Sequence, residues 1–326
     1  MIISKTPLRM SFVGGGSDLP AFYREYGGAV LSTAIDKYIY ITVNKRFDDS
    51  CRVSYSRTEE VASADQVKHP LARECLKLAG CNGGVEVTSI ADIPARGTGL
   101  GSSSSFVVGM LRALYAHAGR YVSADTLARQ ACEIEIERCG EPIGKQDQYA
   151  AAFGGLNVIR FHPDGDVDVE PVVCPHHIVT ELQSQLLAFY TGTTRSASAL
   201  LAEQSRNVAS DDEKKKTLRR MVALVGDCRR ALQTGDLDAF GEILHENWIL
   251  KASLAREISN PQIDEWYDRA RRHGAVGGKL LGAGGSGFLL IQAPAERHAG
   301  ITEALADLRP IPMAFERSGS QIIFCH

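Results

Sequence analysis

The sequence predicts a two-domain protein of the α/β (α+β) class, and three observations lead to this prediction. A length of 326 residues suffices for two domains of ordinary size. The first half mixes alternating, strand-like segments with amphipathic helices. From about residue 180 three amphipathic helices follow one another, and the last part returns to strands and helices in turn. We therefore expect domains over residues 1–178 and 179–326.

The first half carries strand and helix signals in a regular order. Alternating side chains predict strands over residues 38–47, 52–56, 85–90 and 156–161. Apolar residues at helical spacing predict a helix from Ser102 to about Gly119. Ser123 is the expected N-cap of a second helix, which runs through residues 127–138.

The second half begins with a buried strand over residues 185–192. Three amphipathic helices are expected next, over residues 196–207, 215–232 and 237–254, with Gly235 ending the middle one and Asp236 capping the last. Their apolar stripes are typical of a protein core rather than of a cofactor site. The remaining signals predict a helix over 261–274, a strand over 288–293, a helix near 300–308 and a strand over 320–325.

Composition points to a small-molecule partner. The chain is 44% hydrophobic and 23% charged with a net charge of −3, which argues against nucleic-acid binding. There is no apolar run long enough to cross a bilayer and no signal peptide, so a cytoplasmic protein without membrane contact is expected. Its eight cysteines include no C-x-x-C pair, which disfavours zinc and disulfides. The oligomeric state is left open, a homodimer included.

The segment "GTGLGSSSS", residues 97–105, lies between a predicted strand and a predicted helix. A helix start presents unpaired N–H groups and the positive end of the helix dipole, and glycines let an anion approach the backbone. The segment alone is equally consistent with a phosphate-binding loop and with a capped linker, and its spacing is not that of the usual nucleotide P-loop. A second stretch, "GAGGSG" at 282–287, precedes a strand instead of following one, so its match to a dinucleotide fingerprint is discounted.

Charged residues accompany these glycines. Arg9 lies on an N-terminal strand, Asp18 follows three glycines, and Asp147 follows a glycine-containing loop. A helix before Asp147 carries Glu133, Glu135 and Glu137. Each acidic residue alone could be a cap, a turn residue or a solvated charge. An anion site, a metal carboxylate, an isolated aspartate and an arginine are together the components of phosphoryl transfer.

Three motifs, "PLRMSFVGGGSD", "PARGTGLGSSS" and "KLLGAGGSGFLL", resemble those of GHMP-superfamily kinases in the same order along the whole chain. With "GGAVLSTAIDKYIY" and "YTGTTRSAS", the first motif is most similar to the D-glycero-D-manno-heptose 7-phosphate kinases. The resemblance implies an N-terminal domain like the second domain of ribosomal protein S5. It also implies a ferredoxin-like C-terminal domain enlarged by helices, with the active site between the two domains.

The resemblance also implies site roles by position. Asp147 would be the general base and Arg9 the cationic partner that stabilises developing charge. Mg²⁺ would be held by Ser103 and Glu137, with Glu133, on the same α-helical face, in reserve and Glu135 facing away. The ATP phosphates would contact Gly97, Gly99, Leu100, Gly101, Ser102, Ser103 and Ser104. The sugar would contact Gly15, Gly16, Ser17 and Asp18, under a turn containing Gly284 and Gly285.

Two features bear on the substrate. Galactokinase-like members carry Glu and His where this chain has Gly15 and Gly16, which disfavours galactose and removes a carboxylate that would repel a phosphate. Arg195, with Thr194 and Ser196, is expected to grip the distal phosphate of a heptose 7-phosphate, with a surface salt bridge as the alternative role of this arginine.

The resemblance therefore implies ATP- and Mg²⁺-dependent phosphorylation of the anomeric hydroxyl of heptose 7-phosphate, giving the 1,7-bisphosphate for nucleotide-activated heptose and surface polysaccharide. An L-fucose-type sugar 1-kinase is the nearest alternative. A non-catalytic sugar-sensing protein on the same fold is a third possibility, against which the joint presence of Arg9, Ser103, Glu137 and Asp147 argues.

Overall fold

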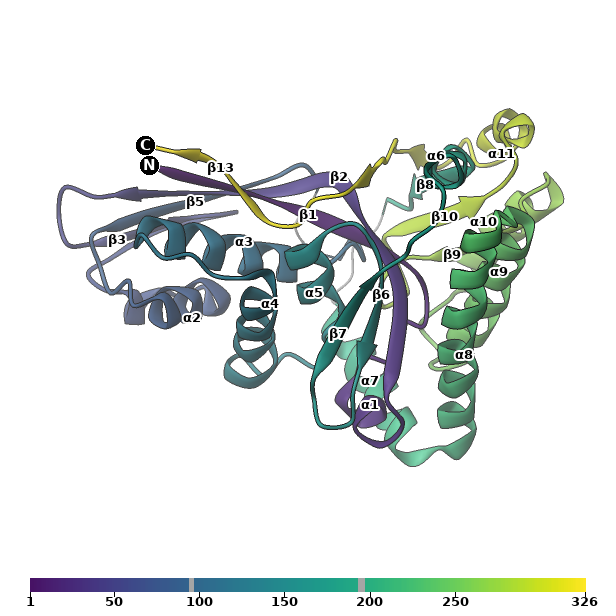
Figure 1. Cartoon of the computed structure of the whole chain (residues 1–326), viewed down its shortest axis with the longest axis horizontal. Coiled ribbons are helices and arrows are strands. Elements are labelled where there is room, and N and C mark those ends of the chain that lie inside the picture. The colour runs from purple at the N-terminus through teal and green to yellow at the C-terminus, as the bar shows by residue number, and fades with distance from the viewer. Residues whose placement is uncertain (94–96, 193–196) are drawn as a thin grey trace.

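Two β-sheets organise the molecule, seen in the computed structural model of Figure 1. The structure describes residues 1–93, 97–192 and 197–326. A nine-stranded sheet contains the N-terminal strands, and a four-stranded sheet lies at the other end of the molecule. The two chain termini lie side by side at the tip of the larger sheet (Figure 1).

The larger sheet is built around a long, bent strand, β2 (Gly28–Lys45). Strand β1 (Ile2–Val13) pairs with it antiparallel along its length. The first half of β2 also pairs with β6, and the second half of β2 pairs with β5. The other strands of the first half are β3 (Cys51–Ser54), β4 (Thr58–Val61), β5 (Val85–Ala91), β6 (Leu156–Phe161) and β7 (Val167–Pro171).

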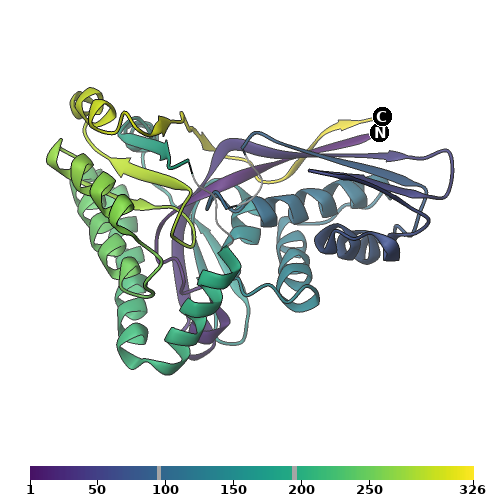
Figure 2. The ribbon, with the colours of Figure 1, turned by 180° about the vertical axis from the view of Figure 1, so that it is seen from behind.

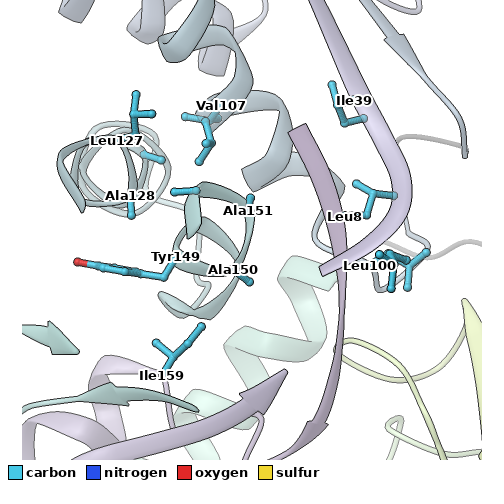
Figure 3. Close-up of a cluster of buried hydrophobic side chains, with 14 of the residues drawn as sticks. Leu8, Ile39, Leu100, Val107, Leu127, Ala128, Tyr149, Ala150, Ala151 and Ile159 are labelled. Atoms are coloured by element: carbon cyan, nitrogen blue, oxygen red, sulfur yellow. The ribbon is translucent and has the colours of Figure 1, made fainter. Parts of the chain in front are cut away.

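Helices cover one face of this sheet (Figure 1). They are α2 (Pro70–Ala79), α3 (Ser102–His117), α4 (Ala124–Cys132) and α5 (Gln146–Phe153), while the short α1 (Pro20–Tyr26) lies at the opposite end from α2. Ser123 accepts a hydrogen bond from Thr126 N at the start of α4, which confirms it as the N-cap. Apolar side chains from β1, β2, β6 and the helices form the core between them (Figure 3).

The smaller sheet has the strand order β11-β8-β10-β9 with all neighbours antiparallel. Its chain order is strand, helices, strand, strand, helix, strand, which is the ferredoxin-like pattern. The strands are β8 (Leu186–Tyr190), β9 (Gly277–Leu280), β10 (Phe288–Gln292) and β11 (Arg309–Pro310). The helices are α6 (His176–Ser184), before β8, then α7 (Ala197–Ser210), α8 (Asp212–Thr234), α9 (Leu237–Ala252), α10 (Pro261–Arg272) and α11 (His298–Ala304).

Helices α8 and α9 lie on the other side of the β1–β2 pair from α2 to α4, as the view from behind shows (Figure 2). Gly235 ends α8 in a left-handed conformation and Asp236 accepts a hydrogen bond from Ala239 N, as expected from the sequence. Phe12 of β1 packs edge-on against Phe240 of α9 at a ring distance of 5.2 Å. The two lobes therefore share a packed junction.

The end of the chain differs from the sequence-based division into residues 1–178 and 179–326. Strands β12 (Phe315–Glu316) and β13 (Gln321–Cys325) leave the second lobe and pair with β2 and β1 of the larger sheet. The two strands thus belong to the larger sheet, and β13 satisfies backbone groups at the edge of β1. Among the described residues, no helix is both long and apolar enough to cross a membrane.

Candidate active site

A cavity of about 830 Å³ opens where the two lobes meet. Its walls come from β1 and the loop after it, the glycine loop before α3, the start of α5, and the ends of α9 and β9. One part is lined by the apolar or aromatic residues Ile39, Tyr55, Pro70, Leu71 and Phe106. Another part is lined by charged residues, namely Arg9, Asp18, Glu141, Asp147, Lys251 and Lys279.

The glycine loop is held open by positive φ angles. Gly97, Gly99 and Gly101 have φ of 70°, 74° and 77°, a region that residues with a side chain rarely adopt. A Cβ at Gly99 would lie 2.3 Å from the carbonyl oxygen of Leu281, so this loop presses closely on the turn after β9. Helix α3 begins directly after Gly101, as expected.

Leu100, which the resemblance places at the ATP phosphates, turns its side chain away from the cavity. Its side chain is fully buried in the core and does not line the cavity (Figure 3). Its carbonyl accepts a hydrogen bond from Arg9 N at 3.0 Å, which fixes the loop to β1. Leu100 thus anchors the loop, and the flanking glycines are the residues that face the cavity.

Arg9 and Asp147 form a bidentate ion pair. Nε and Nη2 of Arg9 donate to the two carboxylate oxygens of Asp147, each at 2.8 Å. Nη1 of Arg9 donates to the Gly99 carbonyl at 2.6 Å, so the pair is fixed to the glycine loop. Arg9 is buried, whereas about a quarter of the Asp147 side chain is accessible, at 24%. The sequence placed both residues in one site, and the structure brings them together.

Asp18 lies at the other side of α5's start. Its carboxylate accepts hydrogen bonds from Gly16 N at 2.9 Å and from Gln146 N at 3.3 Å. Burial raises the pKa of Asp18, and the neighbouring Asp147 charge raises it further. The two aspartates thus interact electrostatically across one cavity, and both line it.

The glutamate beside the serines is Glu135, and the sequence-based choice of Glu137 is corrected. Glu135 is fully buried and accepts hydrogen bonds from the hydroxyls of Ser103 at 2.5 Å and Ser104 at 2.7 Å and from Gln148 Nε2 at 2.6 Å. Glu137 is exposed to solvent. Burial raises the pKa of Glu135 to about 7, against the lowering effect of these three donors.

The glutamates of this segment lie on two faces, and the resemblance implies the metal carboxylate at Glu137, on the outer one. Residues Glu133–Arg138 form a π-helix rather than a continuation of α4. Glu133 and Glu137 both lie on the outer face of this segment, partly and fully exposed, while Glu135 lies on its buried face. Glu133 instead pairs with Arg138 at the surface.

Further sequence-based sugar contacts also differ. The hydroxyl of Ser17 bonds to the backbone of Ala29 and is fully buried, so it closes the loop against β2 rather than facing the cavity. Gly284 and Gly285 pack on Ile258, and their neighbours Gly282 and Ala283 line the cavity instead. Gly15 and Gly16 line the cavity as expected. Thr194, Arg195 and Ser196 lie outside the described residues.

Sequence reasoning missed two lysines, Lys251 of α9 and Lys279 of β9, which are 4% and 3% exposed. The sequence does contain a signal that Lys251 is buried. Lys251 follows Leu244 and Trp248 at helical spacing, which places it on the apolar face of α9 rather than among the solvated residues. A charged residue on a core-facing stripe is rarely accidental.

No group of three or more His, Cys, Asp and Glu side chains that could hold a metal occurs in the part of the chain that the structure describes. A metal here would rely on fewer protein ligands. Mg²⁺ commonly takes one or two carboxylates, keeps several waters and binds substrate phosphates, so Glu135 with Ser103 fits that ion.

The fold and this site define a two-lobed protein with a phosphate-type glycine loop and a carboxylate beside it. Comparisons identify the class. The models for the GHMP kinases N terminal domain and the GHMP kinases C terminal domain match residues 66–155 and 228–305. The chain is also 31% identical over 319 residues to the D-glycero-alpha-D-manno-heptose 7-phosphate kinase of Campylobacter jejuni, with 93% of each chain covered.

The chain therefore belongs to the GHMP kinase family. It is similar in structure to a D-glycero-D-manno-heptose 1-phosphate kinase from Bacteriodes thetaiotaomicron, with a TM-score of 0.81, 27% identity and full coverage of both chains. It is also 26% identical over 311 residues to the bifunctional fucokinase/GDP-fucose pyrophosphorylase of Arabidopsis thaliana, which covers 88% of this chain and 29% of that protein.

Proposed function

We propose that the protein is an ATP- and Mg²⁺-dependent sugar kinase that phosphorylates the anomeric hydroxyl of D-glycero-D-manno-heptose 7-phosphate. The Arg9–Asp147 pair, bonded to Gly99 of the glycine loop, is the observation that carries the proposal. It holds a carboxylate beside the place where a helix start and three glycines would receive phosphates. The similarity to a heptose 7-phosphate kinase supports the choice of sugar.

ATP would lie with its phosphates on the glycine loop and its base toward the apolar wall. Gly97, Gly99 and Gly101 leave the backbone bare, and the first amides of α3 point toward that space. The rings of Tyr55, His69 and Phe106 are in contact, His69 lying edge-on to Tyr55 at 4.6 Å and tilted against Phe106 at 5.3 Å, and they offer aromatic surface to a purine.

The acceptor sugar would lie between Asp18 and Asp147. Each oxygen of Asp147 already accepts a bond from Arg9 but keeps a further lone pair, so this carboxylate can take the proton of the anomeric hydroxyl. The anomeric oxygen of the sugar then attacks the γ-phosphorus of ATP, and the bond between this phosphorus and the leaving ADP oxygen breaks. The Arg9 guanidinium offsets the developing negative charge. Asp18 can accept hydrogen bonds from other sugar hydroxyls.

Glu135 and Ser103 are the residues that would hold Mg²⁺. Without a cation, the carboxylate of Glu135 is buried with only neutral donors, and its charge is costly there. The ion, when bound, neutralises charge on the ATP phosphates. Ser103 is at the first turn of α3, so it can bond either to Glu135, as it does here, or to the ion.

An L-fucose-type kinase is the second candidate, favoured by the similarity to fucokinase-containing proteins at 26% identity. A screen of ADP release with heptose 7-phosphate, the free heptose, L-fucose and galactose separates the two functions. Highest kcat/KM with the heptose 7-phosphate is the expected result. A clear preference for L-fucose would replace the proposal, and no turnover with any sugar would favour a sensor.

Asp147→Asn tests the proton acceptor. It keeps the shape of the side chain but removes the charge, so kcat should fall by about 100-fold or more with ATP affinity little changed. Asp125→Asn is the matched control, because Asp125 lies at the surface on α4 and pairs with Arg129. Near-normal turnover of Asp147→Asn would show that this aspartate is structural.

A further inference from the structure

Two buried ammonium groups in the cavity have no anionic partner. Lys279 Nζ donates to the Phe12 carbonyl at 3.0 Å, and Lys251 Nζ donates to the Gly15 carbonyl at 3.3 Å and to Gln204 Oε1 at 3.2 Å. These acceptors are neutral, and neither lysine is in an ion pair with any residue that the structure describes. An ammonium has three donors, so both keep donors to spare.

A third polar group in the same place is unsatisfied. Ser11 is 4% exposed, lines the cavity, and its hydroxyl has no hydrogen-bond partner among the described residues. Buried polar groups are nearly always paired, so an unpaired hydroxyl beside two unpaired cations indicates a ligand. Burial lowers the pKa of Lys251 to about 8, although the nearby Asp18 charge raises it, and burial with the charges of Lys251 and Arg9 lowers the pKa of Lys279. A bound anion would stabilise the protonated form of both lysines.

The three groups lie on the side of the cavity to which the proposed function assigns the sugar. Arg9 and Ser11 are two residues apart on β1 and point to the same face, and both line the cavity. Lys251 bonds to the Gly15 carbonyl and interacts electrostatically with Asp18, and the proposed function assigns both Gly15 and Asp18 to the sugar. Lys279 bonds to the Phe12 carbonyl, next to Ser11 in the chain, and the Arg9 charge acts on both lysines. An anion among them would therefore belong to the acceptor rather than to ATP.

We propose that Lys251, Lys279 and Ser11 form a subsite for the phosphate monoester that the acceptor carries before the reaction. A phosphate dianion offers three oxygens, which match two ammonium groups and one hydroxyl. Gly15, at the edge of the subsite, adds no side chain that would fill this space. This inference rests on the proposed function, because it names the part of the site that would distinguish a sugar phosphate from a free sugar.

The test compares Lys251→Met and Lys279→Met with the wild type on heptose 7-phosphate and on the free heptose. Methionine keeps the length and apolar stem of the side chain and removes the charge. We expect kcat/KM for the phosphorylated sugar to fall by about 30-fold or more, the range for loss of a buried charged contact. The loss on the free heptose should be less than about threefold. Lys216→Met, an exposed lysine of α8, is the control and should change neither value.

A second readout is independent of turnover. Calorimetric titration of heptose 7-phosphate into the protein without ATP should show binding to the wild type and at least about tenfold weaker binding to Lys251→Met. Equal losses on both sugars, or unchanged binding in the titration, would overturn the subsite and leave the proposed function standing. A wild-type protein that prefers the free sugar would overturn both the subsite and the proposed function. The wild-type kcat/KM values for the two sugars are sufficient to show this preference.

Discussion

At the scale of single residues, Glu135 and Glu137 form a natural matched pair. Glu135→Gln removes the buried charge beside Ser103 and Ser104, so the Mg²⁺ concentration for half-maximal activity should rise by about tenfold or more. Glu137→Gln changes an exposed side chain two residues away and should leave this concentration unchanged. The measurement is activity against Mg²⁺ at saturating ATP. Equal responses of the two variants would remove Glu135 from the metal site.

Residue roles were predictable where one motif fixes one position. Arg9 and Asp147 were expected in one site and lie in contact. The resemblance implies Glu137 as the metal carboxylate, but the carboxylate beside Ser103 is that of Glu135, and Glu137 is exposed. Lys279 lies inside a motif that the sequence singled out, but its burial depends on β9 packing against α9, a long-range contact that local patterns do not contain.

Lys251 also makes a prediction about stability. In the unfolded chain its pKa is near 10.4, and in the folded protein burial lowers it to about 8. Between these values the unfolded chain holds the proton and the folded protein does not, so this residue adds to the free energy of unfolding as pH rises and subtracts from it below pH 8.

The comparison with Lys251→Met isolates this effect. From pH 7 to pH 10 the free energy of unfolding of the wild type should gain about 2 kcal/mol relative to the variant. Denaturant titration of both proteins at the two pH values measures it. A constant difference would mean that Lys251 keeps the same charge in the folded and unfolded states over this range.

At the scale of elements, the loop between β1 and α1 places neighbouring glycines in opposite situations. Gly16 has a φ of 104°, and a Cβ there would lie 2.3 Å from Gln204 Nε2. Gly15 has no such strain, and its Cβ would lie 3.7 Å from the Ser11 hydroxyl, inside the cavity. Gly15 therefore leaves room for the ligand, whereas the backbone conformation at position 16 requires a glycine.

Their alanine variants should therefore separate stability from binding. Gly16→Ala should lower the free energy of unfolding by about 1–3 kcal/mol, because the φ angle is strained for a residue with a side chain. Gly15→Ala should change stability by less than about 0.5 kcal/mol but raise KM for the acceptor, with KM for ATP unchanged. Thermal unfolding measures the change in stability of each variant, and initial rates measure KM for the acceptor and for ATP. An unaltered acceptor KM for Gly15→Ala would place the sugar elsewhere in the cavity.

Elements with a strong periodic pattern were predicted, and those without one were not. Helix α3 begins at Ser102 and α9 at Leu237, where glycine, serine and aspartate signals mark the boundaries. Strand β2 starts at Gly28 rather than near residue 38, because its first half is buried on both faces and shows no alternation. Helix α2 is not among the predicted helices, although Pro70 at its start, its apolar face and Gly80 at its end are helix signals.

At the scale of the whole molecule, the two lobes are one packed unit rather than two independent domains. One apolar core contains residues of β1 and β2 together with Phe240 of α9 and Leu290 of β10. The chain also crosses back at its end, where β12 and β13 join the first sheet. The sequence could not predict that return, because strand patterns do not specify which edge a strand will join.

Phe12 lies at the junction of these parts and tests their coupling. Its ring is fully buried, 5.2 Å from Phe240 of α9 and 6.3 Å from Phe315 of β12, so Phe12→Ala leaves a cavity between segments of both lobes. The free energy of unfolding should fall by about 3–5 kcal/mol, and calorimetry should still show one transition, because one apolar core contains residues of both lobes. Phe47→Ala is the control, since the Phe47 side chain is 109% exposed and should contribute almost nothing. Two separate transitions in the wild type would contradict a shared core and restore the picture of two independently folding domains.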